Sequence, residues 1–189
     1  MRFYGNENSF NRLRNIFSAD RETLGEYAAY LQNFLSGRGL SVNPDKELWS
    51  APGEAWTFLG FSYQNATIDI APATVKKLKA KMRRKARALT RWREQNGLEG
   101  EKAARAFLRV FNRKLLEDPG GNELSWTRWF FPVINTTESL HIIDEYAQDC
   151  ARFLVSGTRT KARFNVRYED LKALGYRSLV HEYYAERDP

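Results

Sequence analysis

Residues 75–93, VKKLKAKMRRKARALTRWR, hold ten basic residues and not one acidic residue. The whole chain has 30 Lys and Arg against 23 Asp and Glu, so the +10 of this segment leaves 7 − 10 = −3 for the rest. On a helical wheel at about 100° per residue, one apolar stripe runs along the segment and basic residues cover most of the remainder. The stripe consists of Val75, Leu78, Met82, Ala86, Leu89 and Trp92. The segment is therefore predicted to be a helix that packs by this stripe and exposes a cationic surface.

The absence of acidic residues from this segment favours a polyanionic partner. Most charged helix faces are only solvated, but they usually mix Glu and Asp with Lys and Arg, because like charges at i, i+3 and i+4 repel. Three interpretations stay open: a nucleic acid partner, an anionic membrane surface, and a solvated face with no partner. Nucleic acid is favoured among them.

Length and composition exclude several classes of protein. A chain of 189 residues with 14% aromatic residues can bury a core and is not a disordered basic tail. It has no run of 18 apolar residues and no signal peptide at its start, so no membrane-spanning segment is expected, and nucleic acid rather than a membrane is the expected partner. The single Cys150 excludes an internal disulfide, and His141 and His181 form no zinc-type cluster. A cytoplasmic, reducing setting is therefore expected.

The part of the chain before the basic helix is predicted to be mixed α/β. A helix begins near Ser18 or Asp20 and ends at Gly37 and Gly39. Residues 40–51 are typical of an interrupted strand, and residues 68–70 of a short strand. Between them, residues 56–63 (WTFLGFSY) indicate an aromatic β-hairpin or buried strand with a glycine at its bend. Alternation along that segment predicts that Leu59 and Phe61 point away from Phe58.

The part that follows residue 73 is predicted to be helical. Pro72 and Thr74 open the basic helix, and further helices are expected over residues 101–117 and 137–155, with an aromatic segment at 124–131 between them. Residues 158–167 are basic again, and short helical turns are expected at 168–174 and 178–185. The resulting fold class is α+β, divided into residues 1–73, 74–156 and 157–189.

The order of these signals resembles the bacterial reverse transcriptases related to group II intron enzymes, in the C-terminal part of their length. In that family a helix at the end of the palm, a turn with a lysine and an aromatic-Leu-Gly hairpin precede a basic thumb helix. The later segments 126–136 (WTRWFFPVINT) and 174–184 (LGYRSLVHEYY) are also similar to that family. The matching residues are Tyr27, Leu31, Phe34, Leu35, Arg38, Gly39 and Leu40, then Asn43, Pro44, Asp45 and Lys46, and then Trp56, Phe58, Leu59, Gly60 and Phe61.

The resemblance implies a palm-like α/β remnant with its hairpin, followed by a thumb-like helical bundle that binds RNA and RNA–DNA duplexes. It implies that Lys46 contacts nucleotide phosphates, and that residues 58–61 form a primer grip in which glycine allows a phosphate to approach the main chain. It also implies contacts with the phosphates that depend on the shape of the duplex rather than on its base sequence. The residues expected to make these contacts are Lys76, Lys77, Lys79, Arg83, Arg84, Arg87, Arg91, Arg159, Lys161 and Arg163.

The sequence departs from this family at the polymerase active site. The family places an Asp-Asp hairpin just before the first helix here, near residues 10–13, but Arg12 and Leu13 cannot ligate Mg²⁺. The acidic pairs at 117–118, 144–145 and 169–170 are expected to stabilise helix termini or face solvent. The chain is therefore predicted to hold no metal or cofactor and to be inactive as a polymerase by itself, although the full-length family enzyme needs Mg²⁺.

Two other functions remain open. The chain could be a stand-alone nucleic-acid-binding or assembly module, in which case no aromatic hairpin is expected beside the basic helix. It could also complement a separately encoded finger-palm portion.

Overall fold

The computed structural model describes residues 15–44, 47–51, 53–117, 120, 125–158, 160 and 162–187. The chain forms two compact units, Met1–Glu54 and Ala55–Pro189. The sequence predicts the first division after residue 73, where the secondary structure changes from mixed to helical. The division into compact units comes earlier, so the aromatic hairpin belongs with the helices.

Within the first unit, helix α1 spans Arg21–Ser36. It begins as predicted, because the Asp20 carboxylate accepts hydrogen bonds from the Thr23 amide (2.7 Å) and the Thr23 hydroxyl (2.8 Å). These bonds lower the pKa of the Asp20 carboxyl. The helix ends at Gly37, and Gly39 has a positive φ of 70°, which lets the Leu40 amide bond back to the Leu35 carbonyl.

The strand predicted over residues 40–51 is wrong for the part of that segment that the structure describes, which has no strand assignment. A strand needs a neighbour that accepts and donates its main-chain hydrogen bonds. All three strands of the described sheet come from residues 56–70, and none of them pairs with the described part of residues 40–51.

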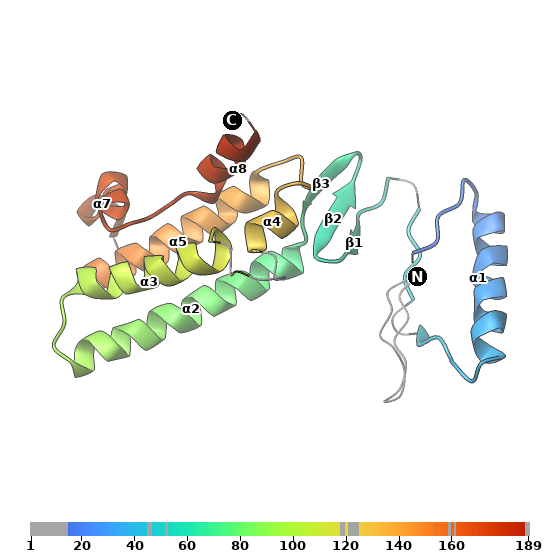
Figure 1. The fold of residues 1–189 in the computed structure, drawn as a ribbon, viewed down its shortest axis with the longest axis horizontal. Helices are drawn as coiled ribbons and strands as arrows, with labels where there is room; N and C mark the ends of the chain where they lie inside the picture. Colours follow the sequence, from blue (N-terminus) through green and yellow to red (C-terminus); the bar gives the residue numbers. More distant parts are fainter. Residues whose placement is uncertain are drawn as a thin grey trace. The chain divides into compact units, whose positions relative to one another are not determined.

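The second unit begins with a three-stranded antiparallel sheet of consecutive strands (Figure 1). The strands are β1 (Trp56–Phe58), β2 (Phe61–Gln64) and β3 (Thr67–Ile70). Both connections are two-residue turns whose central residues have positive φ: Leu59 (50°) and Gly60 (92°), then Asn65 (47°) and Ala66 (61°). Such turns match the twist of antiparallel strands. The hairpin and the short strand are thus confirmed.

The register of this sheet corrects one expectation about its faces. Phe58 pairs directly with Phe61, and Trp56 pairs with Tyr63. Directly opposed residues share a face, so Phe58 and Phe61 lie on the same side, because the chain reverses between them. The rings of Trp56 and Tyr63 stack with their centroids 4.2 Å apart, and the ring centroids of Phe61 and Phe130 lie 5.0 Å apart. The aromatic residues thereby form one packed face.

Three long helices form the bundle beside this sheet (Figure 1). They are α2 (Pro72–Gln95), α3 (Gly100–Leu115) and α5 (Glu138–Ser156), close to the predicted ranges. At one end the Ser139 hydroxyl donates to the Ile70 carbonyl, and at the other Arg93 donates to the Leu154 carbonyl. Helices α2 and α5 therefore run parallel, and α3 runs antiparallel to both.

A close approach fixes the start of α3 against the end of α5. A Cβ atom at Gly100 would lie 2.6 Å from the Leu154 carbonyl oxygen and closer still to that of Val155. Glycine is therefore required at this position for packing. Around this contact the core is continuous and includes Phe107, Leu108 and Ile143, each nearly inaccessible to solvent.

Shorter helices cover this bundle. The aromatic segment forms α4 (Trp126–Phe130), capped by the Ser125 hydroxyl, and the two predicted C-terminal turns form α7 (Tyr168–Ala173) and α8 (Leu179–Arg187). A four-residue helix that the sequence did not predict, α6 (Ala162–Asn165), lies in the basic segment. The observed class is mixed α/β, with several helices and one small antiparallel sheet.

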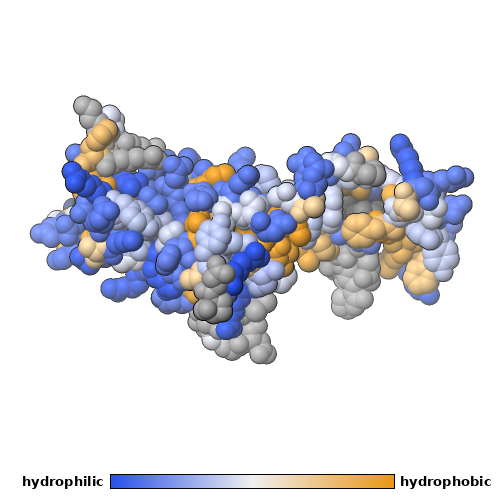
Figure 2. All heavy atoms as spheres, turned by 90° about the horizontal axis from the view of Figure 1, so that it is seen from above, coloured by the Kyte–Doolittle hydropathy of each residue, from blue (hydrophilic) through white to orange (hydrophobic). Residues whose placement is uncertain are grey.

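The hydropathy of the surface side chains agrees with this arrangement of helices and sheet. In the view of Figure 2, hydrophilic side chains cover most of the helical part and hydrophobic ones gather near the sheet. Across the described residues, no helix is both long enough and apolar enough to cross a membrane.

Candidate nucleic-acid interface

Helix α2 carries its cations on the outside of the bundle. Val75, Met82, Ala86 and Leu89 of the predicted stripe are buried, and Leu78 packs against the same core. Trp92 is the exception, since it is 41% exposed. The exposed basic residues of α2 are Lys76, Lys77, Lys81, Arg83, Arg84, Lys85, Arg87 and Arg91.

Two basic residues of α2 have structural contacts. The Lys79 ammonium lies 4.9 Å from the ring centroid of Tyr146 on α5, a cation–π distance. The Arg93 guanidinium donates a 2.9 Å hydrogen bond to the Leu154 carbonyl in the last turn of α5. A cation at that position also complements the negative end of the helix dipole. Lys79 and Arg93 therefore hold α2 against α5.

The exposed cations of α2 have no acidic partner in the described part of the chain. The ion pairs found there join Arg152 to Asp149 at 3.5 Å and Arg177 to Glu182 at 2.7 Å, away from α2. Eight exposed like charges along one helix repel one another unless counterions or a polyanion approach them. This surface, defined by the eight exposed residues, is called the α2 face below.

The predicted primer-grip residues, 58–61, form the turn between β1 and β2, which packs against the start of α2. The Ala71 amide donates a 2.7 Å hydrogen bond to the Gly60 carbonyl. A Cβ at Gly60 would meet the Thr74 hydroxyl at 3.3 Å and the Phe130 ring at 3.4 Å. The close approach at this glycine therefore serves the protein's own packing on that side, rather than leaving space for a phosphate there.

Leu59, at the tip of the same hairpin, combines exposure with a strained backbone. It is 45% exposed, and its positive φ is rare for a bulky side chain. Its carbonyl accepts a 3.4 Å hydrogen bond from the indole of Trp129, which holds the turn against α4. Phe58 is partly buried and Phe61 is buried, so Leu59 is the member of the four that projects furthest into solvent.

Some predicted site residues lie outside the described residues. These are Lys46, Arg159 and Lys161, together with the side chain of Arg163 and the segment 10–13 where the Asp-Asp hairpin was sought. Gly157, which precedes this segment, lies beside α2, because a Cβ there would lie 3.8 Å from the Arg93 guanidinium. Among the described residues, no three His, Cys, Asp or Glu side chains group as metal ligands would.

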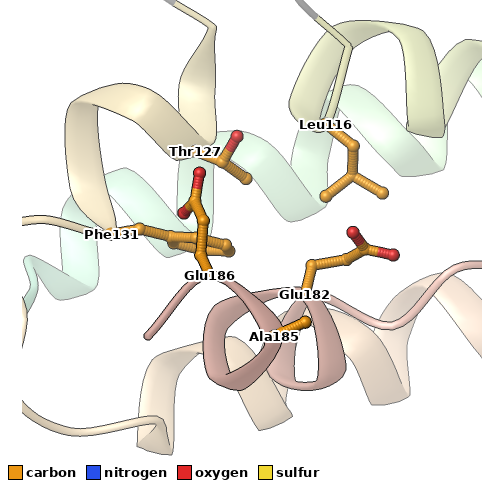
Figure 3. A pocket seen from close by; sticks show the side chains of 6 residues that line it. All are labelled: Leu116, Thr127, Phe131, Glu182, Ala185 and Glu186. Carbon is orange, nitrogen blue, oxygen red and sulfur yellow. The ribbon is translucent and has the colours of Figure 1, made fainter. Parts of the chain in front are cut away.

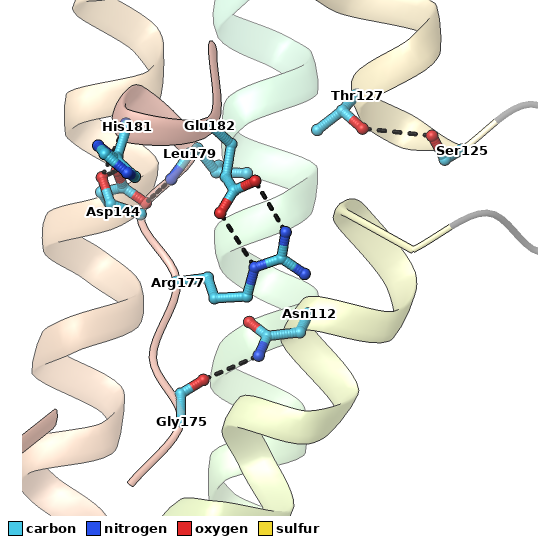
Figure 4. A network of polar contacts seen from close by, with 10 residues as sticks. Asn112, Ser125, Thr127, Asp144, Gly175, Arg177, Leu179, His181 and Glu182 are labelled. Atoms are coloured by element: carbon cyan, nitrogen blue, oxygen red, sulfur yellow. Dashed lines mark hydrogen bonds and ion pairs between the residues drawn. The ribbon is translucent and has the colours of Figure 1, made fainter. Parts of the chain in front are cut away.

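Sequence reasoning missed a buried carboxylate that organises the C-terminus. Asp144 is only 4% exposed and accepts hydrogen bonds from the Ser178 hydroxyl (2.7 Å) and from the amides of Leu179 (3.0 Å) and Val180 (3.1 Å), as Figure 4 shows in part. It caps α8 from within α5, a link that its place in its own helix does not predict. Its partners lie 34–36 residues away, so no local pattern could identify them.

Asp69 and Asn135 are two further polar anchors without a local signal. Asp69 accepts from the Ser139 hydroxyl at 2.8 Å and from the Ser139 amide at 3.3 Å, which caps α5 from the sheet. The Asn135 side chain accepts a hydrogen bond from the Ile68 amide and donates one to the Ala66 carbonyl, each at 2.8 Å. These contacts fix the sheet, and with it the hairpin, to the start of α5.

A pocket of about 210 Å³ lies on the side of the bundle covered by α8 (Figure 3). Leu116, Phe131 and Ala185 form its apolar part, and Thr127, Glu182 and Glu186 its polar part. The Glu182 carboxylate is held by the Arg177 guanidinium at 2.7 and 3.0 Å, and this bond raises the pKa of Arg177. The pocket lacks the cations that a phosphate needs, so it is distinct in chemistry from the α2 face.

Comparison with known proteins yields no match: no family model, no curated protein and no solved structure is significantly similar to this chain.

Proposed function

We propose that this chain binds duplex RNA or an RNA–DNA hybrid through the α2 face. The observation that carries the proposal is the charge of that face: eight exposed cations along one helix, with no acidic partner among the described residues. Phosphate contacts of this kind are electrostatic and independent of sequence. The binding is therefore expected to recognise the backbone rather than particular bases.

We further propose that the chain corresponds to the end of the palm and the thumb of a reverse transcriptase related to group II intron enzymes. The aromatic hairpin directly before the basic helix supports this assignment, because a stand-alone binding module gave no reason to expect it. The 2.7 Å bond between the Ala71 amide and the Gly60 carbonyl ties the hairpin to α2. In this role the chain works in the cytoplasm, binds no cofactor of its own and does not polymerise by itself.

The alternative is a nucleic-acid-binding or assembly module, including one that complements a separate finger-palm portion. Helix α1 favours the complementing version, since Tyr27 and Phe34 on it are exposed and the resemblance places this helix at the end of the palm. Co-purification with a finger-palm protein would support that version, and binding of duplex without any such partner would support the stand-alone version.

The test is binding of a fluorescent RNA–DNA hybrid across a range of salt concentrations. The test variant is Arg83→Glu/Arg84→Glu/Arg87→Glu, and a charge-matched control is Arg21→Glu/Arg38→Glu/Lys172→Glu, whose residues are exposed and lie outside α2 and α3. Removal of three phosphate contacts should make the slope of log K against log salt shallower by about 3. The proposal would be refuted if both variants lost the same affinity for the hybrid, or if the test variant lost none.

A further inference from the structure

A second row of cations lies on α3. Lys102, Arg109 and Arg113 are all exposed. At 100° per residue they fall within about 40° of one another, directly opposite the buried face of the helix. The buried face consists of Ala103, Ala104, Phe107, Leu108, Phe111 and Leu115. The acidic residue within α3 is Glu101, in its first turn, where it complements the helix dipole.

Hydrogen bonds identify the flank of α3 that packs against the end of α7. Arg105 donates to the Ala173 carbonyl at 3.1 Å, and Asn112 donates to the Gly175 carbonyl at 2.8 Å. That flank is therefore occupied by the end of α7. The other flank carries Ala106 and Val110, both partly buried. Helix α2 packs against α3 on the side opposite α7, so this flank faces α2 (Figure 1).

The corresponding flank of α2 is identified in the same way. Lys79 lies over Tyr146, which places that side of α2 against α5. On the helical wheel Lys81 and Lys85 fall on the opposite side, toward α3, and both are exposed. The exposed cations of the two helices therefore form neighbouring rows along the contact between α2 and α3.

Two such rows suit a ligand with two lines of phosphates. The axes of packed helices lie about 8–10 Å apart, so the two rows run as separate lines of charge. A single strand offers one line of phosphates and can neutralise one row. A duplex offers one line from each strand and can neutralise both.

We propose that Lys102, Arg109 and Arg113 contact the second strand of a duplex whose first strand lies on the α2 face. This inference rests on the proposed function and adds the selectivity of the site, namely double-stranded over single-stranded nucleic acid. Arg105 is excluded from the row, because its side chain is used in packing.

The experiment measures binding of an RNA–DNA hybrid of about 20 base pairs, longer than the ~36 Å of α2 at 1.5 Å per residue, and of the RNA strand alone. The variant is Lys102→Glu/Arg109→Glu/Arg113→Glu. The uncharged version, Lys102→Gln/Arg109→Gln/Arg113→Gln, keeps the test valid if charge reversal unfolds the bundle. The α2 variant and the charge-matched control described above are measured in parallel, with helix content followed by circular dichroism.

The expected result is a loss of duplex affinity of at least about tenfold and a salt slope shallower by about 3, with little change for the single strand. Equal loss for duplex and single strand would overturn the inference, because the row would then be part of a general cationic surface. Unchanged duplex binding would overturn it too. The proposed function survives that outcome if the α2 variant still loses binding, and fails if the α2 variant also binds normally.

Discussion

Helices α1 and α3 are both 16 residues long, but their environments differ completely. Helix α1 buries one residue, Ala28, whereas α3 buries six. Tyr30 and Phe34 of α1 are 72% and 43% exposed, while Phe107 of α3 is 2% exposed. Both segments show apolar residues at helical spacing. The difference teaches that such a pattern specifies a helix and its apolar face, but leaves open whether a partner for that face is present.

The largest expected effect contrasts one aromatic residue from each helix. Phe107→Ala should lower the free energy of unfolding by about 3–5 kcal/mol, because it leaves a cavity in the centre of the bundle. Tyr30→Ala should change it by less than about 0.5 kcal/mol, since an exposed ring loses few contacts. Urea denaturation followed by circular dichroism measures both. Similar losses in the two variants would show that α1 is packed as tightly as α3.

The aspartates that cap helices provide a second contrast. Asp144 is buried and caps α8 from α5, so Asp144→Ala leaves the Ser178 hydroxyl and the Leu179 and Val180 amides without their acceptor. The expected loss of stability is about 2–4 kcal/mol. Asp20 is exposed and caps its own helix, so Asp20→Ala should lower only the helix content of α1. An Asp144→Ala protein with wild-type stability would contradict this account of the C-terminus.

These contrasts also separate what could be predicted from the sequence from what could not. Helices α2, α3 and α5 and the hairpin followed from local periodicity and turn residues, because neighbouring residues determine those features. The prediction of a strand at 40–51 was wrong, because strand pairing depends on a partner that is distant in the sequence. The caps made by Asp69 and Asp144 went unseen for the same reason. Of the candidate site, the exposed cations of α2 were predicted, whereas the exposure of Trp92 and the packing against Gly60 depend on tertiary contacts.

Alkaline pH should act on the second unit through Tyr176. Burial, with the charge of Asp144, raises the pKa of Tyr176 above its ordinary value of 10.0. The unfolded chain therefore loses this proton first, and stability is complete below about pH 10 and falls as the pH rises beyond it, by about 1.4 kcal/mol per pH unit. Urea denaturation between pH 9 and 11 should show that the stability of Tyr176→Phe declines less than that of the wild type. An identical decline in both proteins would assign the effect to other groups.

The smallest expected effect concerns two glycines that stand in helices. Gly25 lies within α1, and an added Cβ would meet nothing within 4 Å, whereas at Gly100 it would collide with the carbonyls of Leu154 and Val155. Gly25→Ala should therefore increase the stability of α1 by about 0.5–1 kcal/mol, because alanine loses less backbone entropy in a helix. Gly100→Ala serves as the opposite control and should destabilise the bundle, because the backbones of α3 and α5 must separate. Thermal melting followed by circular dichroism at 222 nm distinguishes the gain in stability from the loss. If Gly25→Ala were destabilising, the face of α1 around this glycine would have to be in close contact with another part of the protein, and the contrast between α1 and α3 would no longer hold.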